Sequence, residues 1–155
     1  MKRLKKFVYV ALMGAMLLLL TACGGASSKS ITFDTGTGDK VKVTLNTTDG
    51  LTLSQEDGVI VVEEGEETIL QGFFIDLDMV AAYVEEIEAN DSIVVLDQGE
   101  QNGITYVFHS VAHETFTEYD YLIRINDSNT GVLIGSAISE EKAKEGFAAL
   151  SFSVE

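Results

Sequence analysis

The chain has 155 residues, a length that predicts one domain of ordinary size with a hydrophobic core that buries most of its surface. Its 25 acidic and 10 basic residues give a formal net charge of −15, which excludes a nucleic-acid-binding protein because nucleic acids require a positive surface. The single cysteine excludes a fold held together by disulfides within the chain.

Residues 1–22 have the pattern of an export signal. Basic residues at positions 2, 3, 5 and 6 precede an apolar run over 7–20 that contains no charge. This run of 14 residues is too short to span a membrane comfortably and is typical of the apolar region of a signal peptide. It ends in the sequence Leu20-Thr21-Ala22-Cys23.

This segment resembles a bacterial lipoprotein signal peptide, with Leu20, Thr21 and Ala22 as the lipobox before Cys23. The resemblance implies cleavage before Cys23 and a diacylglyceryl thioether on its sulfur, so that lipid on Cys23 holds the protein to the membrane. Two or three acyl chains anchor a protein stably. We therefore expect a signal peptide over 1–22, a lipidated Cys23 with a flexible tether over 23–30, and one domain over 31–155 on the extracytoplasmic face of the cell membrane.

The mature chain is strongly acidic. All 25 acidic residues and six of the ten basic ones lie after Cys23, so its formal charge is 6 − 25 = −19. Such a charge argues against electrostatic docking onto anionic lipid. Solubility explains it, and a cationic partner or metal ions are the alternatives.

The first half of the domain is predicted to be rich in strands. Residues 36–40 are interpreted as a turn, and alternating or continuous apolar residues predict strands at 40–45, 51–54 and 59–62. The apolar and aromatic run over 68–75 leads into a helix. Turns are predicted at 48–50 and at Asp57-Gly58. The acidic run Glu63 to Glu67 is expected to form an exposed loop that could hold cations loosely.

A helix is predicted from Asp76 or Asp78 to Asn90. Apolar residues recur at spacings of three and four, which is one buried stripe: Met79, Val80, Tyr83, Val84 and Ile87. Asp76 and Asp78 suit the start of the helix, because a carboxylate accepts hydrogen bonds from free N–H groups there. A carboxylate pair for acid–base chemistry is the alternative interpretation.

The second half is predicted to hold four strands and a closing helix. The strands lie at 93–96, 104–113, 115–125 and 132–138, with a turn over 98–103 and a hairpin loop over 126–131. Tyr119 and Tyr121 share one face of their strand, where we expect them to form core, with an exposed binding surface as the alternative. Ser139 is expected to cap a helix from Glu140 to about Leu150.

This order predicts an α+β fold, in which a mainly antiparallel β-sheet carries two main helices. The order, the helix placement and the closing run from Leu150 to Ser153 resemble the Mog1/PsbP-like α/β/α sandwich, over residues 40–155. The resemblance implies an adaptor or accessory role in membrane-associated assemblies and no transferable active site.

The only two histidines are weak candidates for a metal site. On a helix, the spacing of His109 and His113 would bring their rings together around zinc. On the strand predicted here, the same spacing places them on one face but about 13 Å apart. Residues 126–131 resemble the start of a calcium loop, but the late glutamate of an EF-hand is missing, because Ile138 is twelfth from Asp127. The flanking strands and a glycine explain that segment fully as a hairpin turn, which is the interpretation we favour.

No motif of a nucleophilic enzyme is present in the sequence. We therefore predict a lipid-anchored extracytoplasmic binding or accessory protein without catalytic activity or cofactor, which engages a protein partner or a small ligand at the cell envelope. The first alternative is a metal-binding protein or metal-dependent enzyme that uses His109, His113 and nearby carboxylates. The second alternative is a structural spacer of the envelope.

Overall fold

The computed structural model describes residues 27–155, which form ten strands and two helices. All strand pairs are antiparallel, so this part of the chain belongs to the α+β class with a mostly antiparallel sheet, as predicted. The expected signal peptide, the lipobox and Cys23 lie outside the described residues. Neither described helix is long and apolar enough to cross a membrane.

A small sheet contains β1 (Ser28–Asp34), β2 (Lys40–Asn46) and β10 (Leu150–Val154), in the order β1-β2-β10. Two predicted boundaries are wrong here. Ser28 to Ser30 belong to β1 rather than to a flexible tether, because their backbone pairs with β2. Leu150 starts β10 rather than ending the last helix, because its strand pairs with the other edge of β2.

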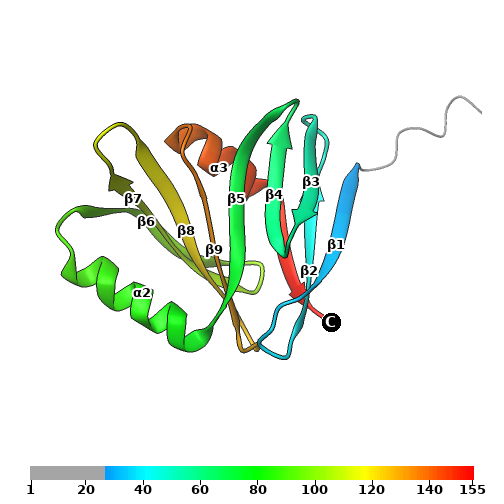
Figure 1. Ribbon diagram of the computed structural model, residues 1–155. Coiled ribbons are helices and arrows are strands. Elements are labelled where there is room, and N and C mark those ends of the chain that lie inside the picture. The colour runs from blue at the N-terminus through cyan, green and yellow to red at the C-terminus, as the bar shows by residue number, and fades with distance from the viewer. Residues whose placement is uncertain (1–26) are drawn as a thin grey trace, which may run out of the picture.

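A large sheet has the order β3-β4-β5-β9-β8-β7-β6. Its strands are β3 (Leu51–Glu56), β4 (Val59–Glu64), β5 (Glu67–Asp76), β6 (Ile93–Gln101), β7 (Ile104–Ala112), β8 (Thr117–Ile125) and β9 (Thr130–Ser136). Sequential strands are joined mostly by short hairpins, and β9 lies between β5 and β8 (Figure 1).

Two-residue turns make several of these hairpins tighter than predicted. Asp57-Gly58 and Asn102-Gly103 both have positive φ at each residue, which is the geometry of the tight turns that match strand twist. The turn predicted over 98–103 therefore shortens to two residues, and β6 extends to Gln101. The loop predicted over 63–67 is likewise wrong, because only Gly65 and Glu66 lie between β4 and β5.

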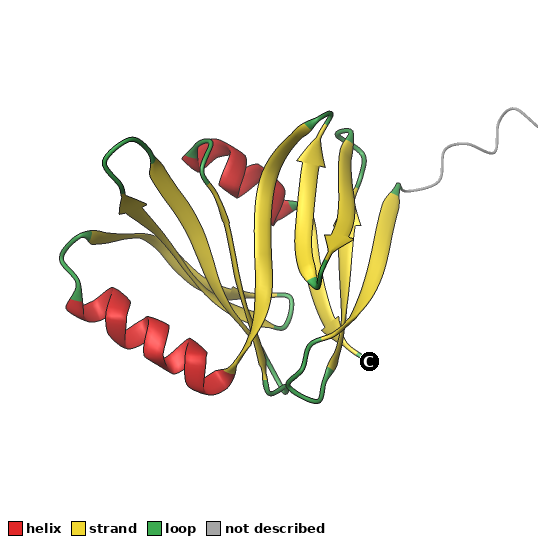
Figure 2. Cartoon of the chain, in the orientation of Figure 1, coloured by secondary structure: helices red, strands yellow, loops and turns green. Residues whose placement is uncertain are grey.

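The two helices, α2 (Leu77–Ala89) and α3 (Glu140–Ala148), cover opposite faces of the large sheet (Figures 1 and 2). Side chains alternate along β8, so Tyr121 and Ile123 point to the face that carries α3 and the small sheet. Leu122 points to the other face, where it packs with Ile87 of α2. We call these the inner and outer faces.

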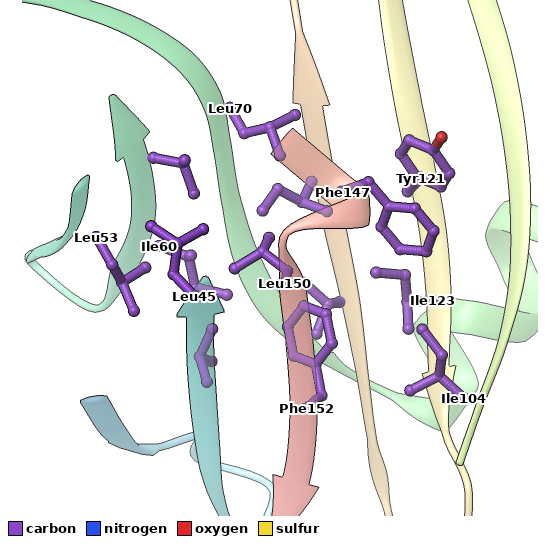
Figure 3. Close-up of a cluster of buried hydrophobic side chains, with 14 of the residues drawn as sticks. Leu45, Leu53, Ile60, Leu70, Ile104, Tyr121, Ile123, Phe147, Leu150 and Phe152 are labelled. Carbon is purple, nitrogen blue, oxygen red and sulfur yellow. The ribbon is translucent and has the colours of Figure 1, made fainter. Parts of the chain in front are cut away.

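The main core lies on the inner face, where side chains of both sheets and α3 meet (Figure 3). The ring of Phe147 stacks on Tyr121 with centroids 3.8 Å apart, and Tyr121 stacks in turn on Phe108. Tyr119 packs against the same cluster. The interpretation of Tyr119 and Tyr121 as core residues is confirmed.

The caps predicted for both helices are confirmed. The carboxylate of Asp76 accepts a hydrogen bond from the backbone N–H of Met79 at 2.8 Å, and Ser139 accepts one from the N–H of Lys142 at 3.2 Å. Asp78 lies exposed in the first turn of α2. Of the apolar stripe of α2, only Ile87 is buried. Helix α2 therefore packs thinly on the outer face, which leaves room between it and the sheet.

Candidate functional site

A row of polar residues crosses the outer face near the C-terminal end of α2. Strand register places His109 of β7 beside Asp120 of β8, Asp120 beside Gly135 of β9, and Gly135 beside Gln71 of β5. The next row along the same face is apolar and consists of Val107, Leu122, Leu133 and Phe73. The polar row therefore lies beside an apolar one, and charged residues occupy the same face further along β8, at Glu118 and Arg124.

The distance between α2 and the sheet differs along the helix. Near its start, Val80 reaches the backbone of β9, where a Cβ on Gly131 would lie 2.3 Å from the Val80 Cγ2. Toward its end, a pocket of about 280 Å³ separates α2 from the polar row. We call it the α2 pocket, and it is lined by Gln71, Phe73, Tyr83, Glu86, Ile87, Asn90, Ile93, His109, Val111, Glu118, Asp120, Leu133 and Gly135.

His109 and Asp120 form the buried polar wall of this pocket. Only 7% of the His109 side chain and 13% of the Asp120 side chain are exposed. The Nε2 of His109 lies 3.9 Å from the Oδ2 of Asp120, which is too long for a hydrogen bond. The Nδ1 of His109 is buried without a hydrogen-bond partner among the described residues. Buried polar groups are normally hydrogen-bonded, so this wall has unused binding capacity.

Gly135 makes room for the Asp120 carboxyl group. A Cβ at position 135 would lie 1.7 Å from the Oδ1 of Asp120. Any larger residue at this position would displace the carboxyl group from the sheet surface. Gly135 therefore allows the Asp120 carboxyl group to lie at the pocket wall. The two residues are far apart in the sequence and are brought together by the pairing of β8 with β9.

Burial changes the charges of both groups at neutral pH. Burial raises the pKa of Asp120 to about 7, and the neighbouring Glu118 carboxylate adds to this effect while His113 opposes it. Burial lowers the pKa of His109, so its ring is neutral at pH 7. The pair can thus hold or release one proton near neutral pH, and it offers both donor and acceptor atoms to a ligand.

The structure does not bring the two histidines together. His113 follows the end of β7, where its Nε2 lies 3.2 Å from the Oε2 of Glu118 and its ring stacks on Phe116. His109 faces Asp120 instead. Within residues 27–155, no group of three or more His, Cys, Asp or Glu side chains could hold a metal ion. The metal site suggested for His109 and His113 therefore has no ligand set in this part of the chain.

The segment that resembles a calcium loop is the hairpin turn between β8 and β9, and its polar atoms bind the protein itself. Ser128 donates to the backbone carbonyl of Ile125 at 2.8 Å. Asp39 accepts hydrogen bonds from the N–H of Asn129 and the hydroxyl of buried Thr130, both at 2.8 Å. The hairpin interpretation is confirmed, but the turn spans only 126–129, because Thr130 and Gly131 belong to β9. Asp39 ties this hairpin to the turn before β2.

A second groove runs along the other flank of α2, with a volume of about 540 Å³. Its walls are mainly apolar and include Leu77, Val80, Val84 and Val107, with Arg124 at its polar side. It contains no buried polar side chain without a partner. The α2 pocket is therefore the better candidate site.

Sequence reasoning identified His109 but missed Asp120 and Gly135. Asp120 lies on the face of its strand opposite Tyr119 and Tyr121, and the sequence pattern assigns it no role. Two features of the sequence could have pointed to the site: an aspartate within a nine-residue strand, and a glycine in the strand that follows. Only the strand register shows that these two residues are neighbours.

No protein-family model matches this chain, and no curated protein matches it at a significant level.

Proposed function

We propose that this chain is a lipid-anchored binding protein of the extracytoplasmic face of the cell membrane, without catalytic activity, and that it binds a small ligand in the α2 pocket. The observation that carries this proposal is the buried His109–Asp120 wall with its unpartnered imidazole nitrogen. Leaving a buried polar group unsatisfied costs about 1–3 kcal/mol. A ligand that bonds to this wall would recover that cost, and titratable groups with shifted pKa values in a cleft are typical of functional sites.

The composition of the pocket supports binding rather than nucleophilic chemistry. None of the described residues that line it is Ser, Thr or Cys, so the pocket lacks the hydroxyl and thiol nucleophiles that an adjacent histidine base most often activates. Its walls combine a few polar groups with apolar and aromatic side chains, which is the usual make-up of a small-molecule site.

The proposed anchor is compatible with an accessible pocket. Strand β1 begins at Ser28, five residues after Cys23, so an extended chain would place the two within about 18 Å of each other. In Figure 1 the start of β1 and α2 lie on opposite sides of the molecule. A lipid on Cys23 would therefore hold the β1 side near the bilayer and leave the α2 pocket toward the aqueous phase.

A relationship to Mog1/PsbP-like domains is part of the proposal. It is supported by the placement of α2 and α3 on opposite faces of a large antiparallel sheet. The structure also has a three-stranded sheet of β1, β2 and β10, whose side chains share the inner core with α3. The relationship would favour an accessory role in a membrane-associated assembly.

A protein partner is the second candidate, and strand β6 favours it. This strand forms one edge of the large sheet and exposes Val94, Val95 and Leu96, whose side chains are 54%, 47% and 38% accessible. Exposed apolar edge strands can pair with a strand of another protein. In-cell cross-linking with Val94→Lys as the variant tests it: one stoichiometric partner lost in the variant supports this candidate, and an unchanged pattern contradicts it.

The ligand proposal is tested by a thermal-shift screen of the full-length protein against a library of small metabolites. We expect at least one compound to raise the melting temperature in a dose-dependent way. Val111→Trp, which fills the pocket, should abolish the shift, whereas Val154→Trp on exposed β10 should retain it. His109→Gln should weaken it. A library without hits, or hits that stabilise Val111→Trp equally, would contradict the proposal.

The anchor is tested separately by mass spectrometry of the membrane-extracted protein. We expect an N-terminal Cys23 with the mass of a diacylglyceryl group, and a Cys23→Ala variant that leaves the membrane fraction. An unmodified Cys23 in the mature protein would refute the anchor without affecting the pocket.

A further inference from the structure

The charge of the α2 pocket narrows the class of ligand, provided that the pocket binds a ligand as proposed above. Glu86 of α2 and Glu118 and Asp120 of β8 contribute three carboxyl groups to its walls. None of the described lining residues is Lys or Arg, and His109 is neutral at pH 7 because burial lowers its pKa. The pocket therefore offers negative charge without a competing positive group.

The unpartnered buried atom of this site is an imidazole nitrogen, which points independently to a ligand. His109 is 95% buried, lines the pocket, and has a buried Nδ1 without a hydrogen-bond partner. A neutral imidazole presents one N–H donor and one acceptor nitrogen. Its Nε2 lies on the side of Asp120, so the ring adds a polar group to the pocket wall beside the three carboxyl groups.

The remaining walls select an apolar body next to the charged group. Phe73 of β5 and Tyr83 of α2 offer aromatic rings, and Ile87 and Leu133 form the apolar floor. Aromatic faces attract cations as well as apolar groups. The volume of about 280 Å³ lies at the lower limit of sites for small molecules.

We propose that the α2 pocket recognises a small protonated amine with a short apolar or aromatic body, whose ammonium group bonds to Asp120 and Glu118 and whose body packs between Phe73, Tyr83 and Ile87. The ammonium supplies N–H donors to carboxylate oxygens, which is a charge-assisted hydrogen bond. An anionic ligand of the same shape would face three carboxyl groups and is rejected.

Amine binding is coupled to the protonation of Asp120. A neighbouring cation favours the ionised form of a carboxyl group. Below pH 7, where Asp120 is protonated in the free pocket, amine binding therefore releases the Asp120 proton. The charged or titratable groups around Asp120 are His109 on β7, Glu118 and the more distant His113, and Glu86 on α2. The affinity for amines therefore rises up to tenfold per pH unit below pH 7 and levels off above it.

Calorimetric titrations of the full-length protein test this proposal with matched probes. Phenethylamine, 2-phenylethanol and phenylacetate share one aromatic body and carry a positive, a neutral and a negative group. At pH 8 we expect phenethylamine to bind at least tenfold more tightly than the alcohol, and phenylacetate not to bind. Hexylamine, hexanol and hexanoate repeat the comparison with a flexible body.

Variants identify the carboxyl groups that recognise the amine. Asp120→Asn should weaken phenethylamine binding at least tenfold at pH 8 and remove the dependence on pH between 6 and 8. Glu86→Gln should weaken it less, and Glu88→Gln, an equivalent change on the same helix outside the pocket, should leave it unchanged. Denaturation curves confirm that each variant is folded.

Three results would overturn the proposal. Equal or tighter binding of the alcohol or the carboxylate would show that charge does not select the ligand. Amine binding that survives Asp120→Asn unchanged at every pH would place the amine elsewhere. If no amine binds but the metabolite screen yields pocket ligands of another class, the amine proposal is wrong and the proposed function stands. If the screen yields no ligand at all, the proposed function itself is wrong.

Discussion

Replacement of Asp120 by asparagine tests the electrostatics of the α2 pocket through protein stability. Asparagine has nearly the same shape as aspartate but cannot ionise, so the variant removes one titration and little packing. The pKa of Asp120 is raised from 3.8 to about 7 in the folded protein, mainly by burial. Folding therefore favours the protonated form of this side chain.

The sign of the pH dependence follows from that direction. Below about pH 4, Asp120 is protonated in both the folded and the unfolded chain and costs nothing. As the pH rises from about 4 to about 7, the unfolded chain ionises first, so the free energy of unfolding falls. Above about pH 7 both states are ionised and the loss is constant. A shift of about 3 pKa units, at 1.36 kcal/mol each, sets this loss at about 4 kcal/mol.

Urea denaturation of the wild type and Asp120→Asn between pH 4 and pH 8 measures the effect. We expect similar stabilities at pH 4 and a variant that is more stable by several kcal/mol at pH 8. His109 destabilises the folded state as the pH falls below 6.5, because burial lowers its pKa, but this effect is common to both proteins and cancels in their difference. Asp91→Asn, on the exposed turn after α2, is the control and should run parallel to the wild type. The raised pKa of Asp120 would be refuted if the free energies of unfolding of Asp120→Asn and the wild type changed in parallel with pH. It would also be refuted if the variant lost stability relative to the wild type as the pH rises.

Three further variants test the packing around the site by chemical denaturation. Phe147→Ala removes the ring stacked in the inner core and should cost about 3–5 kcal/mol; a loss below 1 kcal/mol would contradict the core described here. Gly131→Ala places a Cβ 2.3 Å from Val80 and should cost about 1–3 kcal/mol and increase hydrogen exchange in α2, and unchanged exchange would show that α2 does not rest on β9 there. Asp39→Ala leaves the buried hydroxyl of Thr130 without this acceptor and should cost about 1–3 kcal/mol, whereas a neutral effect would mean that the turn contacts do not matter for stability.

Much of the fold follows from local patterns in the sequence. The Asp76 cap of α2, the Ser139 cap of α3 and the Asp57-Gly58 turn depend on residues close together in the chain, and all are confirmed. The predicted burial of the apolar stripe of α2 is confirmed only for Ile87, and Met79 is exposed. The strands β1 and β10 were not predicted. Their pairing with β2 is a long-range contact that no local pattern contains.

The candidate site was harder to predict for the same reason. His109 drew attention as one of two histidines, but its spacing to His113 pointed to a metal, whereas its actual neighbour is Asp120 on the next strand. The raised pKa of Asp120 arises mainly from burial, with a smaller contribution from the neighbouring Glu118 carboxylate. The burial depends on how distant segments pack, so the sequence alone could not indicate it.

The most direct test of a ligand site beneath α2 is an NMR titration of the full-length protein, with labelled histidine, against phenethylamine at pH 8. The chain contains only two histidines, so the ring signals of His109 and His113 can be assigned with one variant. We predict a saturable shift of the His109 signals that exceeds any change at His113, and its loss in Val111→Trp. His109 signals that stay fixed while phenethylamine reaches millimolar concentrations, or that drift without saturation, would contradict the account.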